Sequence, residues 1–268
     1  RSERRMRAVI MLVALSENSF YLKTIRAIER AVAKYGVSLV LVDARHDAQA
    51  AHAIMSALGQ PFDGAILLSP RFTDRAILEI ARRVPTVVIN RDVRGVASVV
   101  QDSIQGMTLA VQHLVGLGHR DLTHVTGPAE ARIAGARQRA LEAVCLEYGV
   151  RLRMIPGDGT LAGGTEAAGL WQTRPTTSAL CFNDESAIGF VYGLKRLGYR
   201  IPDDVSVIGM GDNAFSEALQ PALTTVGFSA SAQAAAVVER LLLDVPIRER
   251  FVVPMRLIHR ESTGPAST

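Results

Sequence analysis

Short apolar segments alternate with longer amphipathic segments along almost the whole chain. In the first half, apolar runs fall at 9–14, 38–42, 65–68 and 86–89, with a shorter one at 98–100. Between them, apolar residues recur with helical spacing at 19–35, 47–59 and 73–83. Uninterrupted apolar runs are typical of strands buried on both faces, as in a parallel sheet. The pattern therefore predicts strands joined by crossover helices.

A second series of the same kind follows. Its predicted strands are 122–126, 151–155, 179–181 and 205–208, and its predicted helices are 103–118, 131–148, 161–173 and 184–197. A shorter third part has a helix at 230–243, a break at Pro246 and a strand at 251–257. Two consecutive sets of strand–helix alternation predict an α/β fold of two doubly wound parallel-sheet lobes.

Composition agrees with a large folded protein and narrows its class. The 268 residues include 48% hydrophobic and 21% charged residues, enough to bury a full core. No apolar stretch is long enough to cross a bilayer, so no membrane contact is expected. The net charge is +4, and the basic residues are scattered after the first seven, which does not indicate a dedicated nucleic-acid surface in the body of the chain.

The N-terminal residues and the cysteines indicate the cellular compartment of the protein. Residues 1–7 are basic but lack the apolar stretch and cleavage site of a secretory signal. Cys145 and Cys181 lie in apolar surroundings, which favours two inert core thiols over a disulfide or a metal pair. We therefore expect a protein of the reducing cytoplasm.

Motifs for catalysis are missing. The chain has no Gly-x-Ser-x-Gly elbow, Walker phosphate loop, His-Glu-x-x-His or Cys-x-x-Cys sequence. Gly157-Asp158-Gly159 before a helix has only part of a dinucleotide fingerprint, and the histidines show no metal spacing; His119 and His124 flank the start of a strand. The sequence predicts no enzyme, no cofactor and no metal.

Binding is better supported, because polar residues follow two neighbouring predicted strands. Asn183-Asp184 comes directly after the strand at 179–181 and opens a helix, and Asp212-Asn213 follows the strand at 205–208. Parallel strands that end side by side with polar residues form a ligand crevice. A small polar solute suits such a site.

The sequence motifs of the second half, and their order, resemble those of the C-terminal lobe of the LacI/GalR family of bacterial transcription regulators. The resemblance includes the run from Ala179 to Val226, with Pro202-Asp203-Asp204 and Pro221-Ala222-Leu223-Thr224-Thr225. Similar matches are Asn18-Ser19-Phe20-Tyr21, the segment 62–68, Ala110–Leu114 with Gly118-His119-Arg120, Arg132-Ile133-Ala134-Gly135, and Arg260-Glu261-Ser262-Thr263. Together they cover nearly all of residues 7–263.

The resemblance implies a periplasmic-binding-protein-like fold in which the chain crosses between two lobes three times. The expected crossings are near Gln101-Asp102, Val226-Gly227 and Val252-Val253. The implied domains are a linker remnant at 1–6, an N-terminal lobe at 7–101 plus 228–252, a C-terminal lobe at 102–227 plus 253–263, and a tail at 264–268. The expected ligand site is the cleft between the lobes.

Eight residues are candidates for contact with that ligand: Arg132, Asn183, Asp184, Asn90, Phe20, Tyr21, Asp212 and Phe228. Arg132 is the leading one, because it lies where the family places a sugar-contacting arginine and its guanidinium offers five donors. The alternative for Arg132 is pairing with Glu130 or a surface carboxylate.

The other candidates also have structural alternatives. Asp184 is either a ligand contact or a helix N-cap, whereas Asn183 is expected to face the cleft. Asn90 is either a ligand contact or a turn residue. Phe20 and Tyr21 either stack on a sugar face or pack the start of a helix.

Some positions depart from the family pattern. Gly211 stands where relatives usually carry an acidic residue, and Asp212 follows it. Gly159 and Ala230 stand where aromatic residues often line the pocket, and the loop from Pro128 to Arg132 is shortened. These departures predict a roomier or differently shaped pocket and leave the sugar unassigned.

Three functions compete. The first is the effector-sensing and dimerising module of a repressor, whose helix-turn-helix head, absent from this chain, reads operator DNA as a homodimer. Dimerisation is expected through helix 19–35 and the 184–203 region. The second is a solute-binding protein of a sugar transporter, and the third is a sugar-modifying enzyme. The resemblance of the sequence motifs to repressors and the missing export signal favour the first function, the module of a repressor.

Overall fold

The computed structural model describes residues 8–13, 20–43, 62–242 and 250–267. These residues fall into two compact units. Unit 1 comprises the described residues before Asp102 other than Phe20, together with Ser229–Val253. Unit 2 comprises Asp102–Phe228 and the residues from Pro254 onward, and Phe20 is grouped with it. The chain thus passes between the units after Gln101, Phe228 and Val253, and each unit is described by itself below.

Unit 1 is built on a parallel sheet. Among its described residues the strand order is β11-β5-β4-β3-β1-β2, and every pairing is parallel. The strands are β1 (Ala8–Val13), β2 (Ser38–Asp43), β3 (Gly64–Leu68), β4 (Thr86–Ile89), β5 (Ala97–Gln101) and β11 (Arg250–Val253). The helices are α1 (Phe20–Ala33), α3 (Asp74–Ala81) and α8 (Ala230–Leu242).

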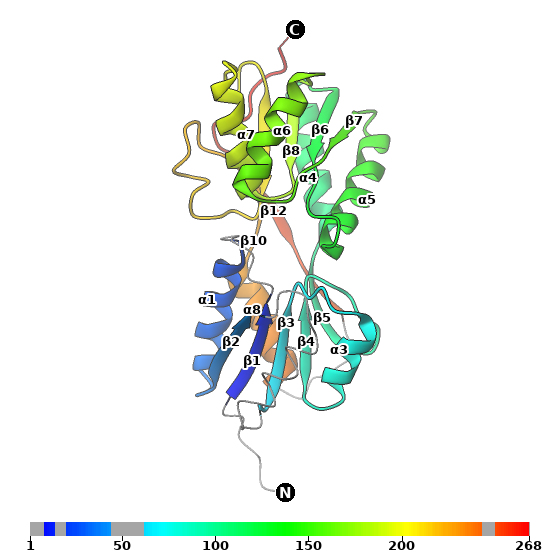
Figure 1. Ribbon diagram of the computed structural model, residues 1–268, viewed down its shortest axis with the longest axis vertical. Helices are drawn as coiled ribbons and strands as arrows, with labels where there is room; N and C mark the ends of the chain where they lie inside the picture. The colour runs from blue at the N-terminus through cyan, green and yellow to red at the C-terminus, as the bar shows by residue number, and fades with distance from the viewer. Residues whose placement is uncertain (1–7, 14–19, 44–61, 243–249, 268) are drawn as a thin grey trace, which may run out of the picture. The chain divides into compact units, whose positions relative to one another are not determined.

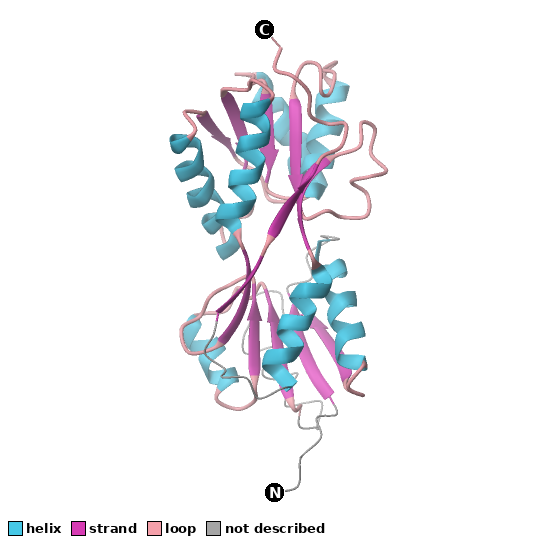
Figure 2. Ribbon diagram, turned by 180° about the vertical axis from the view of Figure 1, so that it is seen from behind, coloured by secondary structure: helices cyan, strands magenta, loops and turns pink. Residues whose placement is uncertain are grey.

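The helices of unit 1 cover both faces of its sheet (Figures 1 and 2). On one face, Ile77 and Ile80 of α3 join an apolar cluster with alternate residues of the strands. On the other face α1 and α8 lie together, and the Thr24 hydroxyl donates to Gln233 Oε1 at 3.1 Å. Every residue of β3, β4 and β5 is buried, as expected for strands that are covered on both sides.

Unit 2 has a second sheet, with strand order β12-β10-β9-β8-β6-β7. Its strands are β6 (Asp121–Val125), β7 (Arg151–Ile155), β8 (Ser178–Cys181), β9 (Ser206–Met210), β10 (Thr224–Phe228) and β12 (Met255–Ile258). The pairing of β12 with β10 is antiparallel, and the other pairings are parallel. The helices are α4 (Ser103–Gly116), α5 (Arg132–Glu147), α6 (Leu161–Gln172) and α7 (Asp184–Arg196).

Two apolar clusters fill the faces of the second sheet. Trp171 of α6 and Phe190 of α7 belong to the cluster on one face, and residues of α4 and α5 form the cluster on the other (Figure 1). Glycines allow α6 and α7 to approach closely. A Cβ atom on Gly164 would lie 2.1 Å from the Ser186 carbonyl oxygen, and one on Gly189 would lie 2.0 Å from that of Leu161. No larger residue fits at either position without moving a helix.

The predicted fold class, two α/β lobes with largely parallel sheets, is confirmed. The helix expected at 47–59 lies outside the described residues. The single strand expected at 251–257 is two strands, because Pro254 separates β11 in one sheet from β12 in the other. Strand β10 was not predicted as a strand, since its threonines and Gly227 interrupt the apolar run.

The last residues of the chain pack onto unit 2. The Gly264 amide donates to Ser206 Oγ at 3.0 Å, and the Ala266 amide donates to the Leu117 carbonyl at 2.9 Å.

Within the described ranges, no helix is both long enough and apolar enough to cross a membrane.

Candidate functional site

Polar residues in strained conformations lie at the carboxyl ends of parallel strands in both units. Ser69 follows β3, Asn90 follows β4, and Asp212 lies two residues after β9. Their φ angles are 49°, 63° and 56°, and they are the non-glycine residues of the described chain that have positive φ. Such strain is retained where the surroundings enforce it, and it is concentrated at functional sites. These strand ends are therefore the candidate site in each unit.

In unit 1, Asn90 is buried with half of its side-chain amide unused. Its Nδ2 donates to Ser69 Oγ at 3.1 Å, and its backbone amide donates to the Val99 carbonyl. Its Oδ1 is buried without a hydrogen-bond donor from the described residues. An unsatisfied buried acceptor carries a free-energy cost, which a ligand hydroxyl would remove. Asn90 therefore adopts a turn conformation and still has an acceptor, Oδ1, with which to contact a ligand.

The arginine next to Asn90 is committed to the protein. Arg91 is buried, and its Nη1 donates to the Pro70 carbonyl at 3.1 Å and to the Phe72 carbonyl at 2.5 Å. Its Nη2 pairs with Asp74 at the start of α3. Arg91 thus braces the β3–α3 loop, and this strand end presents a neutral amide and a hydroxyl.

In unit 2, Asn183 caps α7. Its Oδ1 accepts from the Ser186 amide at 2.8 Å, and the Ser186 hydroxyl lies 3.3 Å from the Asn183 amide, which completes a capping box. Its Nδ2 donates to the Gly159 carbonyl at 2.8 Å. Asn183, expected to be free to face a ligand, thus has internal partners for both side-chain atoms, and only the second lone pair of its Oδ1 is available to a ligand.

Asp184, for which N-capping and ligand contact were both open, is not the cap. It is 1% exposed and accepts three hydrogen bonds: from Thr225 Oγ1 at 2.5 Å, the Asn213 amide at 2.6 Å and Ser216 Oγ at 2.9 Å. Burial raises the pKa of Asp184, against the effect of these donors. The carboxyl group joins α7, β10 and the loop after β9.

Asp212 pairs with the segment that follows β12. Its Oδ1 lies 2.9 Å from Arg260 Nη2, and Arg260 Nη1 donates to the Leu223 carbonyl at 2.8 Å. Gly211, with φ of 130°, precedes it and allows the sharp turn out of β9. Whether Asp212 takes the role of the acid missing at Gly211 stays a hypothesis; in this structure its charge is matched by Arg260.

Arg132 is the first residue of α5, and its side chain is exposed. Within the described ranges it has no hydrogen bond or ion pair, so the alternative of pairing with Glu130 is not observed. The preceding residue, Ala131, provides no side-chain cap. An uncommitted guanidinium at an uncapped helix N-terminus is available to an oxygen-rich ligand.

The aromatic candidates are less informative. Phe20 begins α1, but its side chain lies outside the described residues. Tyr21 is half-buried in the first turn of α1, and Phe228 is buried at the end of β10. Ligand contact by these three residues stays a prediction.

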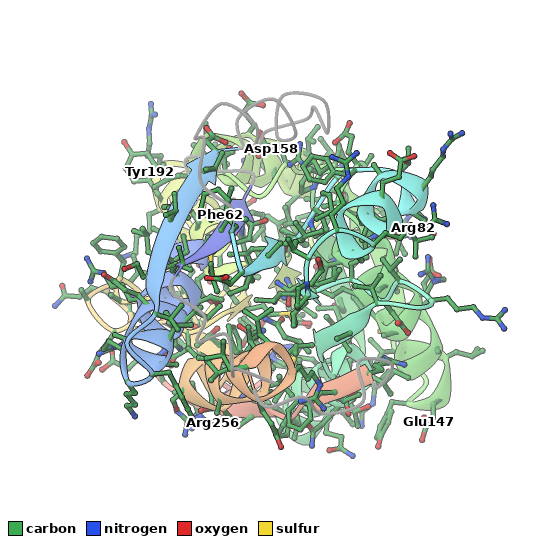
Figure 3. The ribbon with its side chains drawn as sticks, turned by 90° about the horizontal axis from the view of Figure 1, so that it is seen from below. Phe62, Arg82, Glu147, Asp158, Tyr192 and Arg256 are labelled. Atoms are coloured by element: carbon green, nitrogen blue, oxygen red, sulfur yellow. The ribbon has the colours of Figure 1, made fainter. Side chains whose placement is uncertain are left out.

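The glycine-containing loop before α6 is occupied by its own aspartate. Asp158, which is labelled in Figure 3, belongs to this loop. Its Oδ1 accepts from the backbone amide and the hydroxyl of Thr160, each at 2.8 Å. A carboxylate at the N-terminus of α6 stands where a dinucleotide phosphate would bind. Groups of His, Cys, Asp or Glu suited to hold a metal are likewise not found in the described part of the chain.

Comparison with known proteins assigns the family. A family model described as a periplasmic binding protein-like domain matches residues 111–263, more than half of the chain. The crystal structure of a LacI transcriptional regulator from Rhodococcus species superposes with a TM-score of 0.89 and 28% identity, covering 98% of this chain and 100% of that one. The ribose operon repressor of Escherichia coli strain K12 is 31% identical over 227 residues, or 81% of this chain and 68% of that repressor. The chain belongs to the LacI/GalR family.

A further solved LacI-family structure carries a ligand. The regulator from Enterococcus faecium, solved with bound ribose, superposes with a TM-score of 0.87 and 26% identity, covering 97% of this chain and 100% of that one. The predicted resemblance is thereby confirmed, and this chain is a LacI/GalR effector-binding domain.

Two interactions of this LacI/GalR domain were not predicted from its sequence. Arg137 is a buried cation beneath the Phe182 ring, and Arg260 neutralises Asp212. Arg137 lies on the apolar stripe of α5 with Ala134, Leu141 and Val144. A basic residue at such a position signals a buried interaction, so the sequence did contain a clue.

Burial shifts the pKa values of both thiols and of three histidines of the domain toward the neutral forms. Cys145 and Cys181 are both free and buried, and burial raises the pKa of the Cys145 thiol to about 11. Burial lowers the pKa of His124 to about 4, although its Nδ1 is hydrogen-bonded to the Leu180 carbonyl at 2.9 Å. Burial also lowers the pKa values of His113 and His119. As the pH falls, these histidines therefore bind protons at a higher pH in the unfolded chain than in the folded domain.

We expect the free energy of unfolding to fall as the pH drops from about 6.5 toward 4. A histidine whose pKa is lower in the folded state stabilises the fold above its unfolded pKa of about 6.5, and this contribution is lost on acidification. For His124 alone the loss between pH 7.5 and pH 5 is about 2 kcal/mol. Urea denaturation of the wild type and of His124→Asn at both pH values measures it. Equal pH dependence in the two proteins would contradict the assignment to His124.

Proposed function

We propose that this domain senses a small neutral polyol, most simply a sugar, as the effector of a DNA-binding transcriptional repressor. The observation that carries the proposal is the set of polar residues with positive φ at the carboxyl ends of parallel strands in both units: Ser69, Asn90 and Asp212. Strand ends of this kind are the usual ligand-binding edge of open α/β sheets.

The chemistry of these strand ends supports a hydroxyl-rich ligand. Asn90 Oδ1 is an unused acceptor, and Ser69 has a hydroxyl whose oxygen accepts from Asn90. In unit 2, Arg132 offers exposed donors at the start of α5. Acceptors and donors in this mixture suit hydroxyl groups, which both donate and accept. The names of the relatives agree, because one is a ribose operon repressor and another was solved with bound ribose.

The proposed mechanism is a population shift. An effector that binds one arrangement of the domain better than another stabilises that arrangement by its differential affinity. We propose that the parent protein is a homodimer that binds operator DNA through a helix-turn-helix, as the family resemblance implies, and that it works in the cytoplasm without catalysing a reaction. The relatives are transcriptional repressors, which supports a regulator over the transport and enzyme alternatives.

A thermal-shift panel tests the proposal. D-ribose, other pentoses, hexoses, polyols and sugar phosphates are added to the domain, and unfolding is followed. At 100 times its Kd, a ligand that binds only the folded state adds about 2.7 kcal/mol. In a protein of this size that corresponds to about 5–10 °C in Tm. No shift with any member would refute the proposal, and conversion of the sugar, seen by NMR, would support an enzyme instead.

A further inference from the structure

Phe182 has surroundings that are unusual for a buried aromatic residue. It follows β8 directly, at the carboxyl end of that strand, and is 9% exposed. Among the described residues it does not belong to the apolar clusters that fill the two faces of the unit 2 sheet. Its ring instead lies against two glycines and an arginine.

The two glycines belong to loops that follow the neighbouring strands. A Cβ atom on Gly127, after β6, would lie 2.4 Å from Phe182 Cδ2. One on Gly159, after β7, would lie 3.1 Å from Cδ1, on the opposite edge of the ring, and 3.2 Å from Asn183 Nδ2. Three consecutive strand ends are thus shaped around one aromatic ring, and its edges are fixed by backbone.

Arg137 holds one face of the ring and the backbone behind it. Its guanidinium carbon lies over the Phe182 ring, 5.1 Å from the centroid, and its Nη1 donates to the Phe182 carbonyl at 2.7 Å. Arg137 is 2% exposed. A buried cation over an aromatic face is an attractive contact, and the hydrogen bond also fixes where β8 ends. The ring is therefore clamped by its two edges and one face.

We propose that the remaining face of Phe182 is the apolar floor of the effector site in unit 2, and that Arg137 is its positioning residue. This inference rests on the proposed function and deepens it. A sugar ring has a C–H face that stacks on aromatic side chains and an edge of hydroxyl groups. Asn183 is the next residue after Phe182, and Arg132 begins the helix that carries Arg137. The ligand class is thus a sugar with an exposed apolar face.

Matched phenylalanine variants separate a ligand-contact role from a packing role. Phe182→Leu is compared with Phe190→Leu, which changes a buried phenylalanine in the apolar cluster of α6 and α7. The probe is D-ribose, or the panel sugar with the largest wild-type shift if D-ribose gives none. We expect Phe182→Leu to raise the half-saturating sugar concentration at least about tenfold. Phe190→Leu should lower the Tm of the free domain and leave that concentration unchanged.

Matched glycine variants test the clamp. Gly159→Ala adds a methyl group against the ring, whereas Gly149→Ala adds one in open space; the φ angles are 80° and 65°, so both variants carry similar backbone strain. We expect only Gly159→Ala to weaken sugar binding. Unchanged half-saturation in Phe182→Leu would overturn the inference while the proposed function stands. A wild-type domain that responds to no sugar would refute both.

Discussion

Replacing Arg132 by alanine is expected to weaken binding of the effector about 100-fold and to leave the unfolding of the free domain nearly unchanged. Arg132 is exposed and has no partner among the described residues, so its removal takes nothing from the folded structure. Hydrogen bonds from a charged group to a ligand contribute about 1.5–3 kcal/mol, and about 1.4 kcal/mol corresponds to tenfold in affinity. The measurement is the half-saturating concentration of the panel sugar in calorimetry, with the Tm of the free domain.

The same helix offers a control for this experiment. Arg139 is also exposed, lies on nearly the same side of α5 and is two turns, or about 10 Å, further from the strand ends. Arg139→Ala changes the net charge equally, so any general electrostatic effect appears in both variants. Arg132→Ala binding the sugar as tightly as Arg139→Ala would remove Arg132 from the site.

The fold was largely predictable because buried parallel strands have a strong signature. The apolar runs at 65–68 and 86–89 correspond to β3 and β4, which are buried at every position. The failures have local causes. Thr224, Thr225 and Gly227 make β10 look polar, although its threonines are buried and hydrogen-bonded. Pro254 separates two strands of different sheets within one apolar run.

The site was less predictable, because residue type and position do not show which polar group is already satisfied. Asn183 and Asp184 are adjacent polar residues at a strand end, and the sequence suggested that Asn183 faces a ligand. The structure gives Asn183 the capping box and gives Asp184 a buried network. Those partners, Ser216 and Thr225, lie 32 and 41 residues along the chain from Asp184, beyond the reach of any local pattern.

Asp184 is therefore expected to matter for stability. Asp184→Ala leaves the Thr225 and Ser216 hydroxyls and the Asn213 amide without their acceptor in a buried place, and the expected loss in unfolding free energy is about 3–5 kcal/mol. Asp184→Asn keeps the volume and one acceptor oxygen, and the Thr225 hydroxyl is able to rotate and accept from the new amide. Since burial raises the pKa of Asp184, a neutral side chain is tolerated there, and we expect a loss of about 1 kcal/mol.

Urea denaturation of the wild type and the two variants measures these losses, and hydrogen exchange locates them. The amide of Asn213, which donates to the carboxyl group at 2.6 Å, should lose protection in Asp184→Ala and keep most of it in Asp184→Asn. Sugar binding by Asp184→Asn should stay close to that of the wild type, because the carboxyl group faces protein donors. An Asp184→Ala domain as stable as the wild type would show that the loop after β9 is held by other contacts. Lost sugar binding in a stable Asp184→Asn domain would return Asp184 to the list of direct ligand contacts.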